Sequence, residues 1–264
     1  MEVRMLNKAH STGKIVVCIR KETHVGRQLL LLKNKTVALS YDETGQVSQN
    51  FEDDLTIDVN RAYILLPNTK ISHDASRDVV ILAHMQSLQG GKWSGNGRKV
   101  AAKVLKLPSA GVTKENDPLQ EVAIGQHLKD FYQRSQTQVM DNIQTTLQGT
   151  RETGVLMHYD ILFHDSCIYI MMPYFSGGDL CDRCTGEKGT IKKARHYFAG
   201  MLKGIKFLQQ ARICHRDLSL ENLLVDEDDN VIIFDFGLSF QIPYDQSGRR
   251  CLIKTDTVSG KVRN

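Results

Sequence analysis

Three oxygen-bearing side chains follow one another closely in the C-terminal third of the sequence. Asp217 and Asn222 lie in the segment His215-Arg-Asp-Leu-Ser-Leu-Glu-Asn222, and Asp235-Phe-Gly237 begins thirteen residues after Asn222. A carboxylate can orient a hydroxyl group for attack, and a second carboxylate together with an amide oxygen can bind Mg²⁺. These residue types at this spacing therefore indicate phosphoryl transfer from a nucleoside triphosphate.

A lysine and a glutamate upstream favour the same chemistry. Lys103 ends the segment Val100-Ala-Ala-Lys103 on an expected strand, and Glu121 follows eighteen residues later on an expected helix. A strand lysine can hold the phosphates of a nucleotide, and a glutamate on the next helix can pair with it. The alternatives are acidic residues that fall by chance around a turn, and a surface lysine and glutamate that are unrelated. The order of the motifs along the chain favours the catalytic interpretation.

In order and spacing, these segments resemble those of a eukaryotic protein kinase domain, the serine/threonine type more than the tyrosine type. The resemblance implies transfer of the γ-phosphoryl group of ATP to a serine or threonine hydroxyl of a protein substrate, with ATP and Mg²⁺ as cofactors. Asp217 would accept the hydroxyl proton, and Asn222 and Asp235 would bind the metal ion. Lys103, paired with Glu121, would orient the phosphates.

The segment Ile168-Tyr-Ile-Met-Met-Pro-Tyr-Phe-Ser-Gly-Gly-Asp179 resembles the strand and hinge that connect the two lobes of a kinase. The resemblance places Met172 beside the adenine of ATP and lets Asp179 reach the ribose. The Pro173 carbonyl and the Phe175 amide would face the edge of the adenine, and proline serves there because only a carbonyl is needed. The residues expected on the two faces of the adenine ring are Ala101 and Leu224.

The expected phosphate-binding loop departs from the kinase pattern. Kinases usually cover the phosphates with a glycine-rich loop, because glycine lets backbone amides approach closely. Residues 67–78, between the first two expected strands of the domain, contain no glycine. The glycines at 90, 91, 95 and 97 are expected in the next turn, since Gly97 lies only six residues before Lys103. A pseudokinase, which would keep the fold as a binding or scaffold module without turnover, is therefore the main alternative function.

Two further positions concern the catalytic loop and its regulation. Ser219, two residues after Asp217, occupies the position that is lysine in most serine/threonine kinases. Arg216 directly precedes Asp217, and kinases with this arrangement often use the arginine to bind a phosphate on the activation segment. Counting back from Gly260 predicts Thr257 as the phosphorylated residue, and the alternative is an ordinary polar loop.

The expected strands precede the larger helices, which predicts an α+β architecture. The resemblance makes this a two-lobed, protein-kinase-like fold. We expect a β-rich N-terminal extension of unknown role over 1–60 and an N-terminal lobe over 61–173, with an insertion at about 132–152. Part of a C-terminal lobe is expected over 174–264.

Two helices and the chain end carry further expectations. Asp117 can cap a helix that starts at Pro118 and runs to about Phe131. Helical spacing predicts a second helix over 194–210, whose buried face would comprise Phe198, Met201, Leu202, Ile205 and Leu208. The sequence stops at Asn264, before the Ala-Pro-Glu segment and later helices of a kinase, which predicts an incomplete C-terminal lobe with exposed apolar surface. An inactive fragment is the third functional interpretation.

Composition restricts the class of protein. Hydrophobic residues make up 41% and charged residues 24% of the 264 positions, as in an ordinary globular protein. The net charge of +4 is small and its basic residues are scattered, so no nucleic-acid partner is expected. No apolar stretch approaches the roughly 20 residues of a membrane span, so no membrane association is expected. Six cysteines without a secretory signal predict reduced thiols in the cytoplasm or nucleus, and Cys181-x-x-Cys184 lacks the second ligand pair of a structural zinc site.

Overall fold

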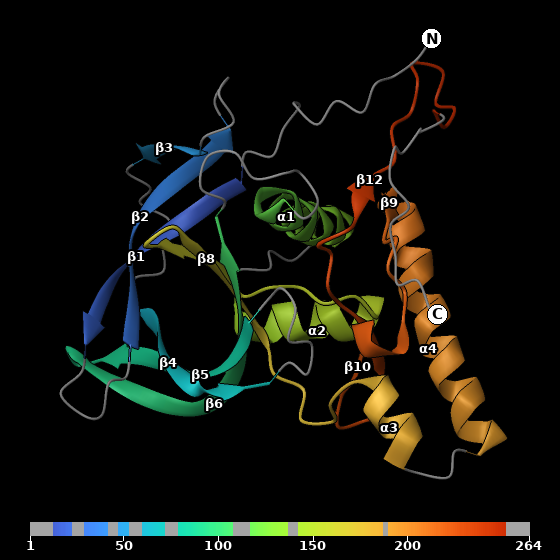
Figure 1. Ribbon diagram of the computed structural model, residues 1–264, viewed down its shortest axis with the longest axis horizontal. Coiled ribbons are helices and arrows are strands. Elements are labelled where there is room, and N and C mark those ends of the chain that lie inside the picture. The colour runs from blue at the N-terminus through green and yellow to red at the C-terminus, as the bar shows by residue number, and fades with distance from the viewer. Residues whose placement is uncertain are drawn as a thin grey trace. The chain divides into compact units, whose positions relative to one another are not determined.

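The computed structural model describes residues 13–22, 29–41, 47–52, 60–71, 79–107, 117–136, 142–186 and 190–251. The chain divides into two compact units. The strand-rich unit comprises Thr12–Lys114 and His158–Tyr174, and the helical unit includes Glu115–Met157 and Phe175–Asn264. Their helices and strands are drawn in Figure 1. No helix in the described ranges is long and apolar enough to span a membrane.

Eight strands form the sheet of the strand-rich unit, and all of them except β3 close into a ring. The ring follows the order β1-β7-β8-β6-β5-β4-β2, with β2 pairing back to β1 and β3 added to β2. Closure of this kind leaves few unpaired strand edges. The strands are β1 (Gly13–Glu22), β2 (Leu29–Tyr41), β3 (Val47–Glu52), β4 (Arg61–Lys70), β5 (Val79–Gln89), β6 (Lys92–Lys106), β7 (Asp160–His164) and β8 (Cys167–Pro173).

Two hairpins of this sheet are explained by their turn residues. Gly90 and Gly91 join β5 to β6, and Asp165 and Ser166 join β7 to β8, all four with positive φ. Positive φ at both central residues suits the right-handed twist of paired strands. The expected turn over 90–97 is thus shorter than predicted, because β6 already begins at Lys92.

Burial in this sheet explains the apolar sequence around Lys103. In β5, buried side chains alternate with more exposed ones, as they do along a strand with one buried face. In β6, by contrast, the four consecutive side chains from Val100 to Lys103 are all buried. A strand covered on both faces reads as a continuous apolar run. Lys103 interrupts that run, and its side chain is nevertheless only 4% exposed.

The helical unit contains four helices and several short strands in its described part. The helices are α1 (Pro118–Ser135), α2 (Ile143–Thr153), α3 (Leu180–Gly186) and α4 (Ile191–Gln210). A 3-10 turn, η1 (Leu220–Asn222), precedes the hairpin of β10 (Leu223–Val225) and β11 (Val231–Ile233). The remaining pair is β9 (Ile213–Cys214) with β12 (Phe240–Gln241).

Local sequence sets the ends of the first two helices. The side chain of Asp117 accepts a hydrogen bond from Leu119 N at 2.9 Å, and Pro118 occupies the first turn of α1, as predicted. Asn142 caps α2 by accepting from Thr145 N at 2.8 Å. Gly154 ends α2 in the left-handed conformation. The segment over about 132–152, which was expected to be an insertion, contains most of α2.

The buried face of α4 differs from the prediction. Leu208 is buried, but Phe198 and Leu202 are 57% and 47% exposed, so the prediction is wrong for these two residues. The face that packs inward carries two glycines beside its larger buried residues. A Cβ atom on Gly200 would lie 3.0 Å from Val231 Cβ, and one on Gly204 would lie 2.6 Å from Ile233 Cδ1. The two glycines therefore let β11 approach the helix backbone closely. The predicted residues Met201 and Ile205 pack against the same core as Leu208.

Candidate active site

The catalytic-loop residues predicted from sequence come together in the helical unit. Asn222 Nδ2 donates hydrogen bonds to the Asp217 backbone carbonyl at 2.8 Å and to Asp217 Oδ2 at 3.0 Å. The turn η1 makes this possible, because it folds the chain back between the two residues. One amide group therefore fixes both the backbone and the carboxylate of Asp217.

His215 connects this loop to the strand that follows. Its Nδ1 accepts from Asp217 N at 3.3 Å, and its Nε2 lies 3.0 Å from the Phe234 carbonyl. These partners require a neutral imidazole with the proton on Nε2, which donates to the carbonyl. The ring also contacts Phe236 edge-on, with centroids 5.4 Å apart. Sequence analysis assigned His215 no role, although it is the first residue of the motif.

The hairpin of β10 and β11 places Asp235 near the same end as Asn222. Leu223 pairs with Ile233, and Phe234 N donates to the Asn222 carbonyl at 3.1 Å. The hairpin thus brings the chain back beside Asn222 just before Asp235. Asp235 itself has a φ of +65°, and Gly237 N donates to its Oδ1 at 3.3 Å. Left-handed backbone is uncommon for a residue with a side chain and is frequent at functional sites.

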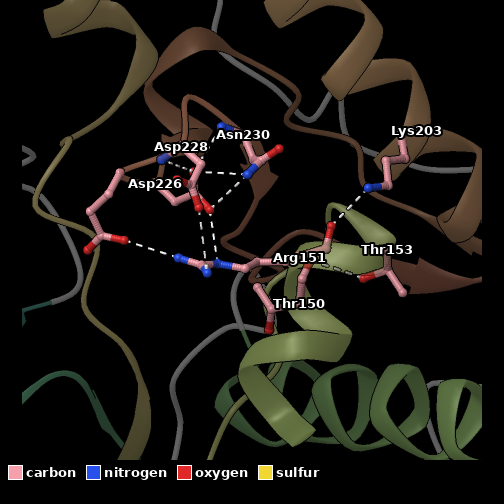
Figure 2. Close-up of polar contacts among 8 residues, drawn as sticks. Thr150, Arg151, Thr153, Lys203, Asp226, Asp228 and Asn230 are labelled. Carbon is pink, nitrogen blue, oxygen red and sulfur yellow. Dashed lines mark hydrogen bonds and ion pairs between the residues drawn. The ribbon is translucent and has the colours of Figure 1, made fainter. Parts of the chain in front are cut away.

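The opposite end of this hairpin is organised by Asp226, which is fully buried (Figure 2). Its Oδ1 accepts from the backbone amides of Asp228 and Asn230, both at 2.9 Å. Arg151, on α2, adds an ion pair from its Nε to Asp226 Oδ2 at 3.1 Å, and its Nη2 donates to Glu227 Oε2 at 3.1 Å. The turn between the two candidate metal-binding residues is therefore tied to α2.

The C-terminal end of α2 is fixed on two sides. Lys203 Nζ, from α4, donates to the Arg151 carbonyl at 2.9 Å, as Figure 2 shows. Beyond the helix, Ile233 N donates to the Gly154 carbonyl and Leu156 N donates to the Ile233 carbonyl, both at 2.9 Å. Arg151 thus lies in a segment that is bonded to α4 and β11. Sequence analysis missed this residue because the acidic partners of its side chain are 75 or more positions away.

The predicted glutamate lies close to the Asp-Phe-Gly segment. Glu121 is buried on α1, and a Cβ atom on Gly237 would lie 3.5 Å from Glu121 Oε2. The preceding residue, Gln120, donates from Nε2 to the Ser239 carbonyl at 2.6 Å. Helix α1 is therefore bonded to the chain that follows Asp235.

The predicted lysine belongs to the strand-rich unit, whereas Glu121 belongs to the helical unit. Within its own unit, Lys103 on β6 is paired with Ile170 on β8, and Ala101 is paired with Met172. Ala101, Met172 and Lys103 are all buried. The pairing of Lys103 with Glu121 stays a prediction.

The residues of the helical unit that are expected to contact the ribose and the adenine also lie together. Asp179 forms an isolated antiparallel bridge with Leu224, and Val225 N donates to the Gly178 carbonyl at 3.0 Å. Asp179 Oδ1 accepts from Asp182 N at 2.8 Å, so its carboxylate stabilises the start of α3. Phe175 is buried, and its carbonyl accepts from Gly178 N.

The regulatory residues are only partly described. Arg216 has a φ of +69°, and its guanidinium carbon lies 5.7 Å from the centroid of the Phe240 ring. Thr257 and residues 72–78 of the glycine-free loop lie outside the described residues. Among the residues that are described, no group of three or more His, Cys, Asp and Glu side chains could hold a metal ion. Cys181 and Cys184 are free thiols.

Comparison with known proteins assigns the family. The family model for the protein kinase domain matches residues 89–260. The chain is 47% identical over 98 residues to serine/threonine-protein kinase grp of Drosophila melanogaster, covering 37% of this chain and 19% of that protein. It is 27% identical over 189 residues to the SNF1-related protein kinase catalytic subunit alpha KIN12 of Arabidopsis thaliana, covering 68% of this chain and 31% of that protein. The chain therefore spans less than a third of the length of these relatives, and it belongs to the protein kinase domain family.

Proposed function

We propose that this chain is the ATP-binding part of a serine/threonine protein kinase, which transfers the γ-phosphoryl group of ATP to a protein hydroxyl. The observation that supports this most is the contact of Asn222 with the Asp217 carboxylate, next to a hairpin that returns the chain to Asp235. The similarity to serine/threonine kinases favours serine or threonine as the acceptor residue.

The donor set of the helical unit fits Mg²⁺. Asp235 offers carboxylate oxygens and Asn222 an amide oxygen, and hard divalent cations of this kind prefer oxygen ligands. The Asn222 amide nitrogen is turned toward Asp217, which leaves the amide oxygen as its other polar atom. A bound Mg²⁺ would neutralise charge on the β- and γ-phosphates.

The remaining residues would orient the substrate hydroxyl and the nucleotide. Asp217 would accept the proton of the substrate hydroxyl, in a carboxylate orientation that Asn222 fixes. Lys103 would hold the α- and β-phosphates, and Glu121 would hold Lys103. Ala101, Met172, Pro173, Phe175 and Leu224 would contact the adenine, and Asp179 the ribose.

A peptide-panel assay tests the acceptor class. The protein is incubated with γ-labelled ATP, Mg²⁺ and matched peptides that differ only in carrying serine, threonine or tyrosine. We expect label on serine or threonine peptides. Label on the tyrosine peptide alone would contradict the proposed substrate class.

A pseudokinase is the second candidate, and the glycine-free sequence of residues 67–78 favours it. Thermal melting with and without millimolar Mg·ATP separates nucleotide binding from turnover, since a ligand of the native state raises the melting temperature. Active kinase requires both a shift and labelled peptide. A shift without labelled peptide supports the scaffold function. If neither a shift nor labelled peptide is observed, ATP has no part in the function of this chain.

We also propose that Arg216 binds a phosphate on Thr257. A phosphothreonine carries close to two negative charges, and a guanidinium can bind it through two hydrogen bonds. Mass spectrometry of active protein should find phosphate at this threonine. Active protein with Thr257 unmodified would contradict the proposal.

A further inference from the structure

The N-terminal strands β1, β2 and β3 share their sheet with the strand that carries Lys103. β2 pairs with β4 through Leu29–Leu32, and β1 pairs in parallel with β7 at Val16 and Val17. β1 and β2 therefore bridge the two strands, β4 and β7, that would otherwise form open edges of the sheet.

Buried side chains on β2 support this arrangement. Leu31, Val37 and Leu39 have no exposed surface. An extension that folded apart from the rest would have to bury these side chains within its own few strands, which is rarely stable for so small a sheet. The apolar residues of β2 thus contribute to the core of the strand-rich unit.

A charged group connects β2 to the rest of the unit in the same way. We define the buried charge cluster as Lys33 on β2, Arg61 and Tyr63 on β4, and Asp160 on β7. Lys33 Nζ donates to Asp160 Oδ1 at 3.0 Å. Arg61 donates from Nε to Oδ2 at 2.8 Å and from Nη2 to Oδ1 at 3.0 Å, and the Tyr63 hydroxyl donates to Oδ2.

The charges of this cluster depend on one another. Burial alone would raise the pKa of the Asp160 carboxyl, but the Lys33 ammonium and the Arg61 guanidinium more than offset it and hold the pKa well below its usual range. The ionised carboxylate in turn lies between two cations, so removing it would leave the buried Lys33 and the largely buried Arg61 without their counter-charge. The side chains of Lys33 and Asp160 are only 2% and 9% exposed, which limits screening by solvent.

The partners of Asp160 come from outside the family match. Asp160 lies within residues 89–260, whereas Lys33, Arg61 and Tyr63 all precede residue 89. Of the two cations, Lys33 lies in the N-terminal extension, so a carboxylate within the family match has a buried cation supplied by that extension.

From these contacts we infer that the strands β1, β2 and β3 are an intramolecular partner of the kinase domain. They close the sheet carrying Lys103 through β1 and β2 and are held there by the contact of Lys33 with Asp160. This gives the N-terminal segment a role that does not depend on which protein the kinase phosphorylates, or on whether it turns over ATP. The segment is part of the folded unit that presents Lys103, instead of a separate module beside it.

A charge-relief experiment on the full chain tests this role. Asp160→Asn should lower the melting temperature by about 5 °C or more, because it leaves Lys33 and Arg61 facing each other. Adding Lys33→Met removes one of these cations, so the double variant Lys33→Met/Asp160→Asn should melt at a higher temperature than Asp160→Asn alone. Lys92→Met, at an exposed lysine at the start of β6, is the matched control and should give no such recovery.

The outcomes separate cleanly. Recovery by Lys33→Met but not by Lys92→Met supports the contact, and so does an Asp160→Asn chain that folds only when Lys33→Met is added. A further fall in the melting temperature when Lys33→Met is added to Asp160→Asn would overturn the inference. If neither variant with Asp160→Asn folds, hydrogen exchange of the single Lys33→Met variant decides. Amides of β2 and β7 should then exchange at least about tenfold faster than in Lys92→Met, and equal rates would overturn the inference.

Discussion

In the proposed mechanism, Asn222 would serve two functions with one amide group. Its nitrogen fixes the Asp217 carboxylate and carbonyl, and its oxygen is the atom that we assign to the metal ion. His215 supports the same loop from the other side, because its two ring nitrogens link the Asp217 amide to the Phe234 carbonyl. The position of Asp217 therefore depends on two side chains that do not themselves transfer a proton.

The buried position of His215 leads to the first prediction. His215→Phe keeps the ring shape but leaves the Asp217 amide and the Phe234 carbonyl without this partner, which should reduce the free energy of unfolding by about 1–3 kcal/mol. His84→Phe, at an exposed histidine of β5, is the control. Urea unfolding of both variants measures the difference, and equal stability of the two would contradict the role of the His215 hydrogen bonds.

At the scale of elements, the β10–β11 hairpin carries both candidate metal-binding residues, Asn222 and Asp235, at its open end. Its turn is held by Asp226, and Arg151 attaches that turn to α2 (Figure 2). The hairpin is only three residues long on each side, so its own ladder hydrogen bonds are few. We infer that the side-chain contacts at the turn contribute much of its rigidity.

The second prediction concerns these turn contacts. Asp226→Ala should cost about 2–4 kcal/mol of unfolding free energy, because several buried donors lose their acceptor. Arg151→Met should cost about 1 kcal/mol, because its side chain is 36% exposed and its ion pairs are partly screened. Hydrogen exchange should rise at the β10 and β11 amides in both variants. Arg134→Met, at an exposed arginine of α1, is the control. Unchanged hydrogen exchange in Asp226→Ala would refute the stabilising role of these turn contacts.

The third prediction is a pH dependence of the strand-rich unit. The neighbouring cations hold the pKa of Asp160 below that of an unfolded carboxyl, so its contribution is fully present above the unfolded value of about 4 and is lost progressively as pH falls below it. The difference in melting temperature between the native chain and Asp160→Asn should be constant above about pH 5 and should shrink toward pH 3. A difference that grows on acidification would contradict this assignment.

At the scale of the whole molecule, sequence predicted best what depends on nearby residues. The catalytic loop, its distance to Asp235 and the Asp117 cap of α1 are local patterns, and the structure brings Asp217 and Asn222 into contact. The kinase family follows from the same patterns and is confirmed by the family match over residues 89–260.

Features that depend on distant partners were missed. The inward face of α4 includes glycines that admit β11, and counting large apolar residues missed them and wrongly selected Phe198 and Leu202. The closure of the sheet by β1 and β2 depends on pairing with β7 more than a hundred residues away, and no local period encodes such pairing. The contact of Lys33 with Asp160, which are 127 positions apart, was missed for the same reason.

Phosphoryl transfer by Asp217→Asn, compared with the native chain, tests the central claim most directly. The substitution removes the proton acceptor and keeps the shape of the side chain, so labelled phosphate on a serine or threonine peptide should fall by about 10²–10⁴-fold. The Mg·ATP-induced rise in melting temperature should be preserved, and Asp182→Asn, at an exposed aspartate of α3, should change neither quantity. Most of the transfer activity surviving in Asp217→Asn would show that this carboxylate is not the catalytic base.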